Sequence, residues 1–143
     1  MNKVAIVYWS GTGNTENMAN MLAEGAKAAG AEVQLRSVDA ADAEELVSYE
    51  GFALGCPSMG AEELEESEME PFVSSLKGKV QGKKVVLFGS YGWGDGEWMR
   101  NWAEQMQGAG AEIIGGEGII CNDAPDAEAE ARLKEAGKIL AQM

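Results

Sequence analysis

The stretch VAIVYW at residues 4–9, followed by SGTGNT at residues 10–15, decides the fold. Residues 4–9 form an apolar run that is too short for a helix and partly β-branched, which predicts a strand buried on both faces of a sheet. Such strands occur in parallel sheets that lie between two layers of helices. The glycines and hydroxyl residues that follow predict a tight turn into a helix, whose apolar face carries Met18, Met21 and Leu22.

The same alternation of strand and helix patterns continues along the chain. Further strands are expected at residues 33–38, 51–57 and 84–90, and a last strand interrupted by glycines at 113–120. Helical patterns occupy residues 43–47, 71–76, 98–106 and 127–143.

Strands that alternate with helices at these lengths predict an α/β fold. The favoured arrangement is a doubly wound five-stranded parallel sheet of order 2-1-3-4-5, with helices on both faces. Its ligand would lie at the carboxyl ends of the first and third strands. No linker or repeat divides the pattern, so residues 1–143 are expected to form one domain.

The composition restricts the function. The net charge is −13, from 24 acidic against 11 basic residues, which argues against a nucleic-acid ligand and fits a basic protein partner. An acidic surface also keeps proteins soluble, so this observation is open to two interpretations. The absence of histidine excludes Ser-His-Asp and Cys-His catalysis and most zinc sites. No catalytic residue is expected, and any chemistry must come from a cofactor.

The two cysteines, Cys56 and Cys121, stand apart from each other and from any ligand cluster, so neither a disulfide framework nor a metal site is implied. Both are expected to be buried small apolar residues. No apolar run reaches the roughly 20 residues of a membrane span, and residues 1–7 lack the apolar core of a signal peptide. A cytoplasmic location is expected.

Residues 10–15 have the composition of an anion site, in which backbone N–H groups at a helix N-terminus point toward a phosphate. The loop contains no Lys or Arg, so neutral donors must hold the anion. A Walker loop lacks its Lys-Ser/Thr pair here, and a dinucleotide fingerprint requires a small residue where Glu16 stands. A single phosphomonoester fits best, with an ordinary capped helix start as the alternative.

Taken with the strand before and the helix after, residues 10–15 resemble the phosphate loop of flavodoxins, and the resemblance covers the whole chain. In that family the loops after strands three and four clamp a flavin ring; here they are PSMGAE at 57–62 and SYGWGDG at 90–96. The second loop is similar to that of the clostridial-type, short-chain members. The direct passage from residues 119–120 to the final helix supports the short form. The resemblance implies one non-covalently bound FMN.

The residues of these loops also suit a flat cofactor. Trp93 lies among glycines, which let the backbone approach a ligand and leave the indole as a platform. The resemblance places Met59 on the inner face of the ring and Glu62 as an acceptor for the pyrimidine N3–H. In contrast, Trp98 and Trp102 have helical spacing and are expected to pack in the core.

The expected cofactor contacts come from four segments at one edge of the sheet. They are Ser10, Gly11, Thr12, Gly13, Asn14, Thr15, Pro57, Ser58, Met59, Gly60, Ala61, Glu62, Ser90, Tyr91, Gly92, Trp93, Gly94 and Asn122. The resemblance implies that the peptide at Gly60 turns its carbonyl toward flavin N5 on reduction. Ala61 departs from the polar or glycine residue expected after it.

The resemblance implies a low-potential one-electron carrier that shuttles electrons between redox proteins, not an enzyme. Its partners would be ferredoxin-type reductases and oxidoreductases with basic docking surfaces, and the protein is expected to be a monomer. The alternative is a flavodoxin-like two-electron FMN reductase acting on a quinone or NAD(P)H. Short connections and the lack of a histidine or spare base near the flavin favour the carrier.

A run of acids follows the first flavin loop. They are Glu62, Glu63, Glu65, Glu66, Glu68 and Glu70. We expect these charges to steer a basic partner and to lower the potential of the second electron step. A solvated helix face without redox consequence is the alternative.

Overall fold

The computed structural model describes residues 3–11, 13–59, 64–92 and 94–143. Its strands form one parallel sheet in the order β2-β1-β3-β4-β5, and β6 also pairs with β4. The strand bounds are Lys3–Tyr8 (β1), Glu32–Ser37 (β2), Gly51–Gly55 (β3), Lys84–Tyr91 (β4), Glu112–Ile113 (β5) and Ile119–Asn122 (β6). The predicted order 2-1-3-4-5 is confirmed.

The interrupted last strand becomes two short strands on the same side of β4. Lys84 pairs with Glu112 at the beginning of β4, and Phe88 pairs with Ile119 nearer its end. Between them Gly115 and Gly116 have φ values of 84° and 82°, a left-handed conformation that breaks the ladder.

The end of the second strand differs from the prediction. Val38 was expected in that strand but begins a 3-10 turn, η1 (Val38–Ala40), in which its side chain is still buried. The hydrophobic pattern therefore identified a core residue but not its conformation.

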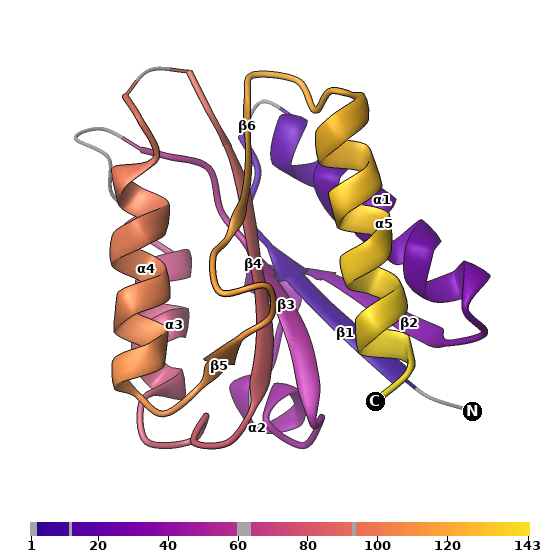
Figure 1. Cartoon of the computed structure of the whole chain (residues 1–143). Coiled ribbons are helices and arrows are strands. Elements are labelled where there is room, and N and C mark those ends of the chain that lie inside the picture. Colours follow the sequence, from indigo (N-terminus) through magenta and orange to yellow (C-terminus); the bar gives the residue numbers. More distant parts are fainter. Residues whose placement is uncertain (1–2, 12, 60–63, 93) are drawn as a thin grey trace.

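Helices cover both faces of the sheet, as predicted (Figure 1). Their bounds are Asn14–Ala28 (α1), Ala43–Leu46 (α2), Met69–Leu76 (α3), Glu97–Gly108 (α4) and Ala127–Ala141 (α5). The side chains of α1 and α5 form one buried cluster with the sheet, and those of α3 and α4 form another. Trp98 and Trp102 lie in the second cluster, which confirms that they are packing residues.

Two glycines let α1 and α5 approach each other closely. A Cβ atom at Gly25 would lie 2.1 Å from the carbonyl oxygen of Lys134, and one at Gly137 would lie 2.1 Å from that of Leu22. Only a residue without a side chain fits at either position. The contact leaves α1 firmly seated, with its N-terminus at the carboxyl end of β1.

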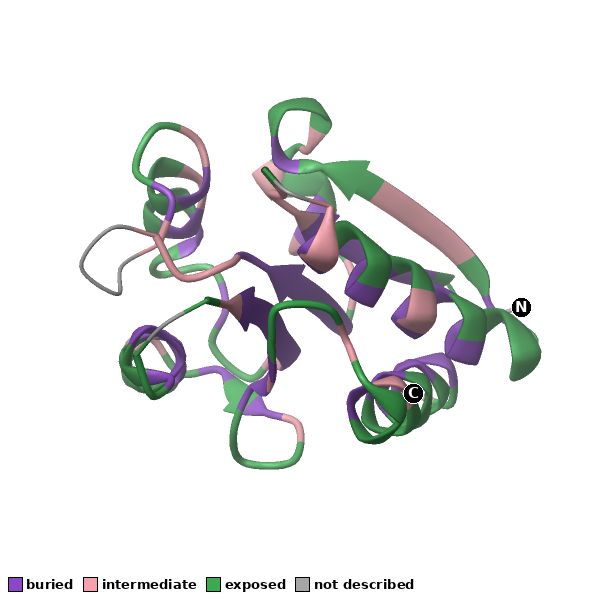
Figure 2. Cartoon of the chain, turned by 90° about the horizontal axis from the view of Figure 1, so that it is seen from above, coloured by how far each residue is buried: buried purple, intermediate pink, exposed green. Residues whose placement is uncertain are grey.

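The carboxyl ends of β1, β3 and β4 meet at one edge of the sheet, which Figure 2 shows from above. These central strands are largely buried, so the loops that leave them start from fixed positions. Cys56 and Cys121 are buried free thiols, as expected. Among the described residues, no helix is long and apolar enough to cross a membrane.

Candidate cofactor site

The first predicted loop, residues 10–15, contains Gly13, the residue directly before α1. Gly13 has φ 99°, a left-handed conformation, and a Cβ atom there would find no described residue within 4 Å other than its chain neighbours. The Gly13 N–H donates to Ser10 Oγ at 3.1 Å, which closes the loop on itself. The helix thus starts at a residue that can adopt this backbone without strain and that no distant described residue crowds.

The helices differ in how their N-termini are capped. Asp42 Oδ1 accepts from the Glu44 N–H at 3.0 Å in α2, and Asp126 Oδ1 accepts from the Ala129 N–H at 2.8 Å in α5. In contrast, the N-cap residues of α1 and α4 are the left-handed glycines Gly13 and Gly96, which have no side chain to accept a hydrogen bond from the helix. The N-terminus of α1 therefore has backbone donors available for an external anion.

Ser90, at the end of β4, joins three of the predicted segments. Its N–H donates to Thr15 Oγ1 at 3.4 Å, and its carbonyl accepts from the Ser58 N–H at 3.0 Å. The next carbonyl, on Tyr91, accepts from the Asp123 N–H at 2.8 Å. Hydrogen bonds at two consecutive residues thus connect the loops that follow β1, β3 and β6.

The loop after β4 is held by its own helix. Arg100 donates to the Asp95 carbonyl from Nη1 and to its carboxylate from Nη2, both at 3.0 Å. Gly96 is buried with φ 91°, and a Cβ atom there would lie 2.9 Å from Ile120 Cδ1. The turn after Tyr91 is therefore fixed at its helical end.

The segment after β3 contains Glu65, one of the acids that were expected to steer a partner and to lower the potential of the second electron step. Glu65 is only 6% exposed, and its two oxygens accept hydrogen bonds from residues 67–69 at the start of α3. Burial acts to raise the pKa of this carboxyl, but the hydrogen bonds from Ser67, Met69 and Glu68 outweigh it, so the pKa lies below its usual value. Glu65 is a structural cap, so its charge is engaged within the fold.

Glu68 is also engaged within the fold. It is half-buried, and its Oε1 accepts from Trp9 Nε1 at 3.2 Å. Because Trp9 directly precedes the first loop, this bond connects the phosphate loop to the acidic run. Sequence reasoning missed both Trp9 and the role of Glu65. The only available signal was an acid placed a few residues before a helix start, a position at which acids cap helices.

The structure brings the described members of the predicted site to one edge. Two of these members are buried, Thr15 and Ser90. The partly buried members are Ser10, Gly13, Asn14, Pro57, Ser58, Met59 and Tyr91. The exposed members are Gly11, Gly92, Gly94 and Asn122. Asn122 pairs with Tyr91 in the sheet, which places it beside the loop after β4. The predictions for Thr12, Gly60, Ala61, Glu62 and Trp93 fall outside the described residues.

The described residues fit an FMN phosphate. The uncapped start of α1 and the Ser10 and Thr15 hydroxyls supply neutral donors. Among the described residues, chain neighbours aside, no side chain fills the space beside Gly13. Glu16, the acid that follows residues 10–15 in the chain, is exposed and accepts from the Tyr8 hydroxyl at 3.5 Å. Neutral donors at a helix N-terminus are a chemically suitable set for an anion.

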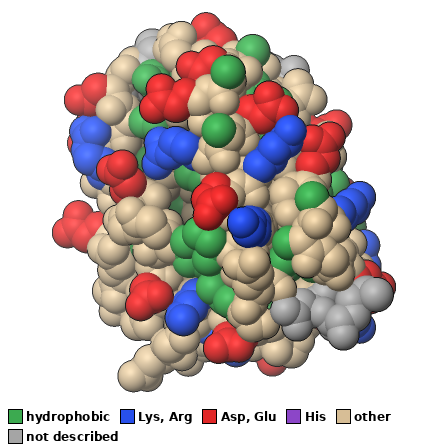
Figure 3. All heavy atoms as spheres, turned by 45° about the vertical axis from the view of Figure 1, so that its right-hand side comes forward, with side chains coloured by type: hydrophobic (Ala, Val, Ile, Leu, Met, Phe, Trp, Pro, Cys, Tyr) green, Lys and Arg blue, Asp and Glu red, His purple; other side chains and the backbone are tan. Residues whose placement is uncertain are grey.

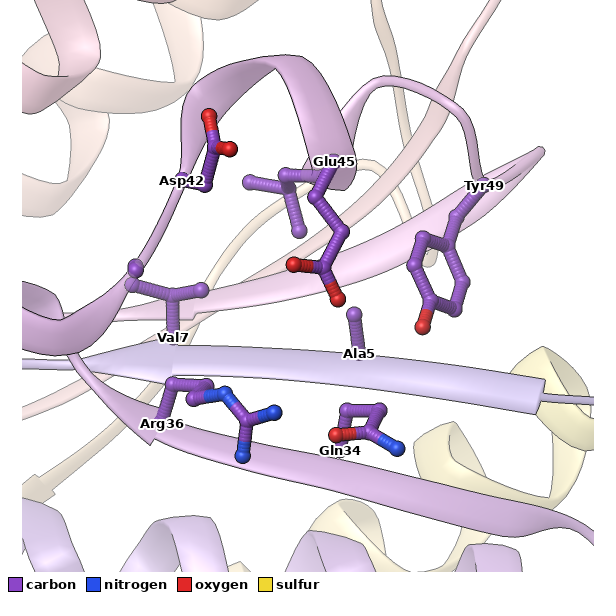
Figure 4. A pocket seen from close by; sticks show the side chains of 9 residues that line it. Ala5, Val7, Gln34, Arg36, Asp42, Glu45 and Tyr49 are labelled. Carbon is purple, nitrogen blue, oxygen red and sulfur yellow. The ribbon is translucent and has the colours of Figure 1, made fainter.

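Two hollows elsewhere are separate from this edge. A small pocket between β1, β2 and α2 has Gln34, Arg36, Glu45 and Tyr49 around it (Figure 4), but its volume of about 20 Å³ holds little more than one water molecule. A wider hollow of about 330 Å³ beside α5 is lined by apolar residues, Ile139 among them, and by the charged residues Glu117, Arg132 and Glu135. Figure 3 shows the neighbouring face over α1 and α5, where acids and bases are interspersed.

Comparison with known proteins agrees with this geometry. The sequence matches the family model of flavodoxins over residues 6–135. It is 49% identical to the flavodoxin of Megasphaera elsdenii over 97% of this chain and 98% of that one. It is also 49% identical to the flavodoxin of Clostridium beijerinckii over 96% and 99%.

A solved structure shows the same fold. The solution structure of two-electron-reduced Megasphaera elsdenii flavodoxin matches with a TM-score of 0.87 and 46% identity, over 98% of this chain and 99% of that chain. The clostridial-type resemblance is confirmed, and the alternative of a two-electron reductase is set aside, since relatives at this identity are electron-transfer proteins. The chain belongs to the flavodoxin family and is an electron carrier that binds FMN, not an enzyme.

Proposed function

We propose that residues 1–143 form one domain that holds FMN across the carboxyl edge of the sheet. The phosphate lies in residues 10–15, and the ring lies between residues 57–62 and residues 90–94. Asn122 contributes a lateral contact. The observation that carries this proposal is the junction at Ser90, which connects the helix start at Thr15 to the segment at Ser58.

The phosphate is held without a basic side chain. The backbone N–H groups at the start of α1 and the hydroxyls of Ser10, Thr12 and Thr15 act as donors, and the helix dipole adds positive potential. Neutral donors lower the free-energy cost of the fold when the site is empty, because no buried cation is left unpaired. The loop therefore selects a phosphomonoester by geometry.

The ring is held by apolar and aromatic surfaces. Met59 packs on its inner face and Trp93 on its outer face, and Glu62 accepts a hydrogen bond from N3–H. Bound FMN supplies the redox chemistry. The chain positions the ring, excludes water from its two faces and leaves one edge open to a partner.

The charge distribution supports a basic partner at this edge. Residues 56–70 and 123–130 contain acids and no base, whereas five lysines lie near the opposite edge. These are Lys3, Lys77, Lys79, Lys83 and Lys84. This uneven placement of the basic residues orients the carrier in the electrostatic field of a partner before contact. Ferredoxin-type reductases and oxidoreductases with basic docking surfaces are the proposed partners, met as a monomer in the cytoplasm.

The site is tested by titrating the apoprotein with FMN and with riboflavin, which lacks the phosphate. Each hydrogen bond to a charged group contributes about 1.5–3 kcal/mol, so we expect FMN to bind more than about tenfold tighter. Reductive titration should show two separate one-electron steps. Equal affinity for the two ligands would contradict the assignment of residues 10–15.

A further inference from the structure

The segment between β3 and α3 returns to the point where it leaves the sheet. The Glu65 N–H donates to Cys56 Sγ at 3.4 Å, so the two ends of residues 57–64 lie side by side. Both closing residues are buried: Cys56 is 0% exposed and Glu65 is 6% exposed. This contact joins the two residues that flank the segment and so closes its base.

The Glu65 side chain fixes one end of this base. Its Oε1 accepts from the Glu68 N–H at 2.7 Å and from the Met69 N–H at 3.1 Å. Its Oε2 accepts from the Ser67 N–H at 2.9 Å and from the Ser67 hydroxyl. Hydrogen bonds to an ionised carboxylate are about twice as strong as neutral ones, so this arrangement holds the first turn of α3 firmly against Glu65.

Cys56 fixes the other end. Its N–H donates to the Phe88 carbonyl at 3.0 Å, and its carbonyl accepts from Trp98 Nε1 at 3.1 Å. Trp98 is buried on α4, so the base of the loop is connected to β4 and α4 as well as to α3. Cys56 and Glu65 together join the loop to the elements that surround it.

We propose that Glu65 is a positioning residue for FMN, which holds the loop bearing Met59 against the ring by closing its base. The inference rests on the proposed contact between residues 57–62 and the ring. The carboxylate acts through its four hydrogen bonds, which lie on the side of α3, and its effect is therefore geometric. Loss of these bonds lets the base of the loop move relative to the start of α3, which reduces the preorganisation on which ring binding depends.

The test compares Glu65→Gln with Glu66→Gln, which removes the same charge from an exposed neighbour. A glutamine has only one acceptor oxygen and cannot satisfy all the donors that Glu65 satisfies. We expect Glu65→Gln to raise the Kd of the apoprotein for FMN and for riboflavin by the same factor, about tenfold. It should also shift the one-electron potentials further than Glu66→Gln does.

A second variant separates the effect of the charge at position 65 from the effect of the side-chain length. Glu65→Asp keeps the charge but shortens the side chain by one methylene, so it should weaken the binding of both FMN and riboflavin, as Glu65→Gln does. If Glu65→Gln and Glu65→Asp bound both ligands like Glu66→Gln, the proposal would be overturned. Where Glu65→Gln does not fold, Cys56→Ala removes the sulfur acceptor from the same closure. It should give a smaller loss in the same direction, and unchanged affinity would overturn the proposal.

Met59→Ala distinguishes this inference from the site on which it rests. If Met59→Ala weakens FMN binding but Glu65→Gln does not, the ring contact stands and the closure is not what positions it. If Met59→Ala has no effect, the proposed ring contact itself fails. Amide exchange in the apoprotein gives a readout without cofactor: the Glu68 and Met69 N–H groups should exchange faster in Glu65→Gln than in Glu66→Gln.

Discussion

The hydroxyl oxygen of Thr15 accepts a hydrogen bond from the backbone N–H of Ser90 at 3.4 Å, across 75 residues of sequence. Thr15 is 1% exposed and Ser90 is 5% exposed, so the bond is shielded from water. It connects the first turn of α1, where we place the phosphate, to the end of β4, where the ring loop begins. The two halves of the proposed site are thereby fixed relative to each other.

Thr15→Val tests this relationship. The substitution keeps the branched shape but removes an acceptor for Ser90 and a donor for the phosphate. We expect FMN affinity to fall about tenfold or more, and the free energy of unfolding of the apoprotein to fall by about 1–2 kcal/mol. Titration with FMN and urea denaturation measure the two effects. Thr15→Ser retains the hydroxyl and should lose less of both; FMN affinity unchanged in Thr15→Val would contradict the assignment.

Local patterns sufficed to predict the fold and the loops at its edge. A continuous apolar strand followed directly by alternating glycine and hydroxyl residues indicates both a parallel sheet and a helix start that faces an anion. Parallel strands place their carboxyl ends at one edge, which predicted where a ligand would lie. The resemblance to flavodoxins, and not this geometry, assigned the loops that contain Ser58 and Ser90, which hydrogen-bond across that edge.

The acidic run shows what the sequence could not reveal. Glu65 and Glu66 are identical residues at adjacent positions, yet Glu65 is buried and Glu66 is exposed. The difference arises because the chain folds back onto Cys56, a contact that no local periodicity encodes. The bond between Trp9 and Glu68 joins residues 59 positions apart and is equally invisible to a pattern.

The lowered pKa of Glu65 predicts a pH dependence of stability. Its usual value is 4.5, so the ionised carboxylate stabilises the fold above about pH 4.5, and this contribution is lost as the pH falls through the lower pKa of the folded state. Urea unfolding of the apoprotein between pH 7 and pH 3 should show a difference between wild type and Glu65→Gln that shrinks toward the acid end. A constant difference across this range would argue against a stabilising charge.

The two thiols should be unreactive in the folded protein. Burial raises the pKa of Cys56 to about 12 and that of Cys121 to about 11, both from a usual 9.0. At pH 8 the thiolate fractions would be on the order of 10⁻⁴ and 10⁻³, and only the thiolate reacts. Mass spectrometry after iodoacetamide treatment should find neither modified natively and both modified in urea. Rapid native labelling of either cysteine would show that its burial is not maintained.

The remaining acids near the site offer a clean test of charge. Glu66 and Glu70 are exposed, unlike Glu65. Glu68 is left unchanged because its carboxylate accepts a hydrogen bond from Trp9. The double variant Glu66→Gln/Glu70→Gln therefore removes charge without disturbing the caps. Glu104→Gln/Glu112→Gln removes two exposed acids that lie away from the carboxyl edge and serves as its matched control.

Fully reduced FMN is expected to be an anion, so nearby carboxylates disfavour the last electron. A pair of charges at about 10 Å in a water-like dielectric interacts by roughly 0.4 kcal/mol, before salt screening. With about 59 mV for each 1.4 kcal/mol, the Glu66/Glu70 double variant should raise the second one-electron potential by at most about 35 mV. The same change should flatten the salt dependence of electron transfer to a basic partner, because steering by these charges is lost. The Glu104/Glu112 control should alter both quantities less. If potentiometry and stopped-flow kinetics found no difference between the two double variants, the acidic run would serve solubility and not partner recognition.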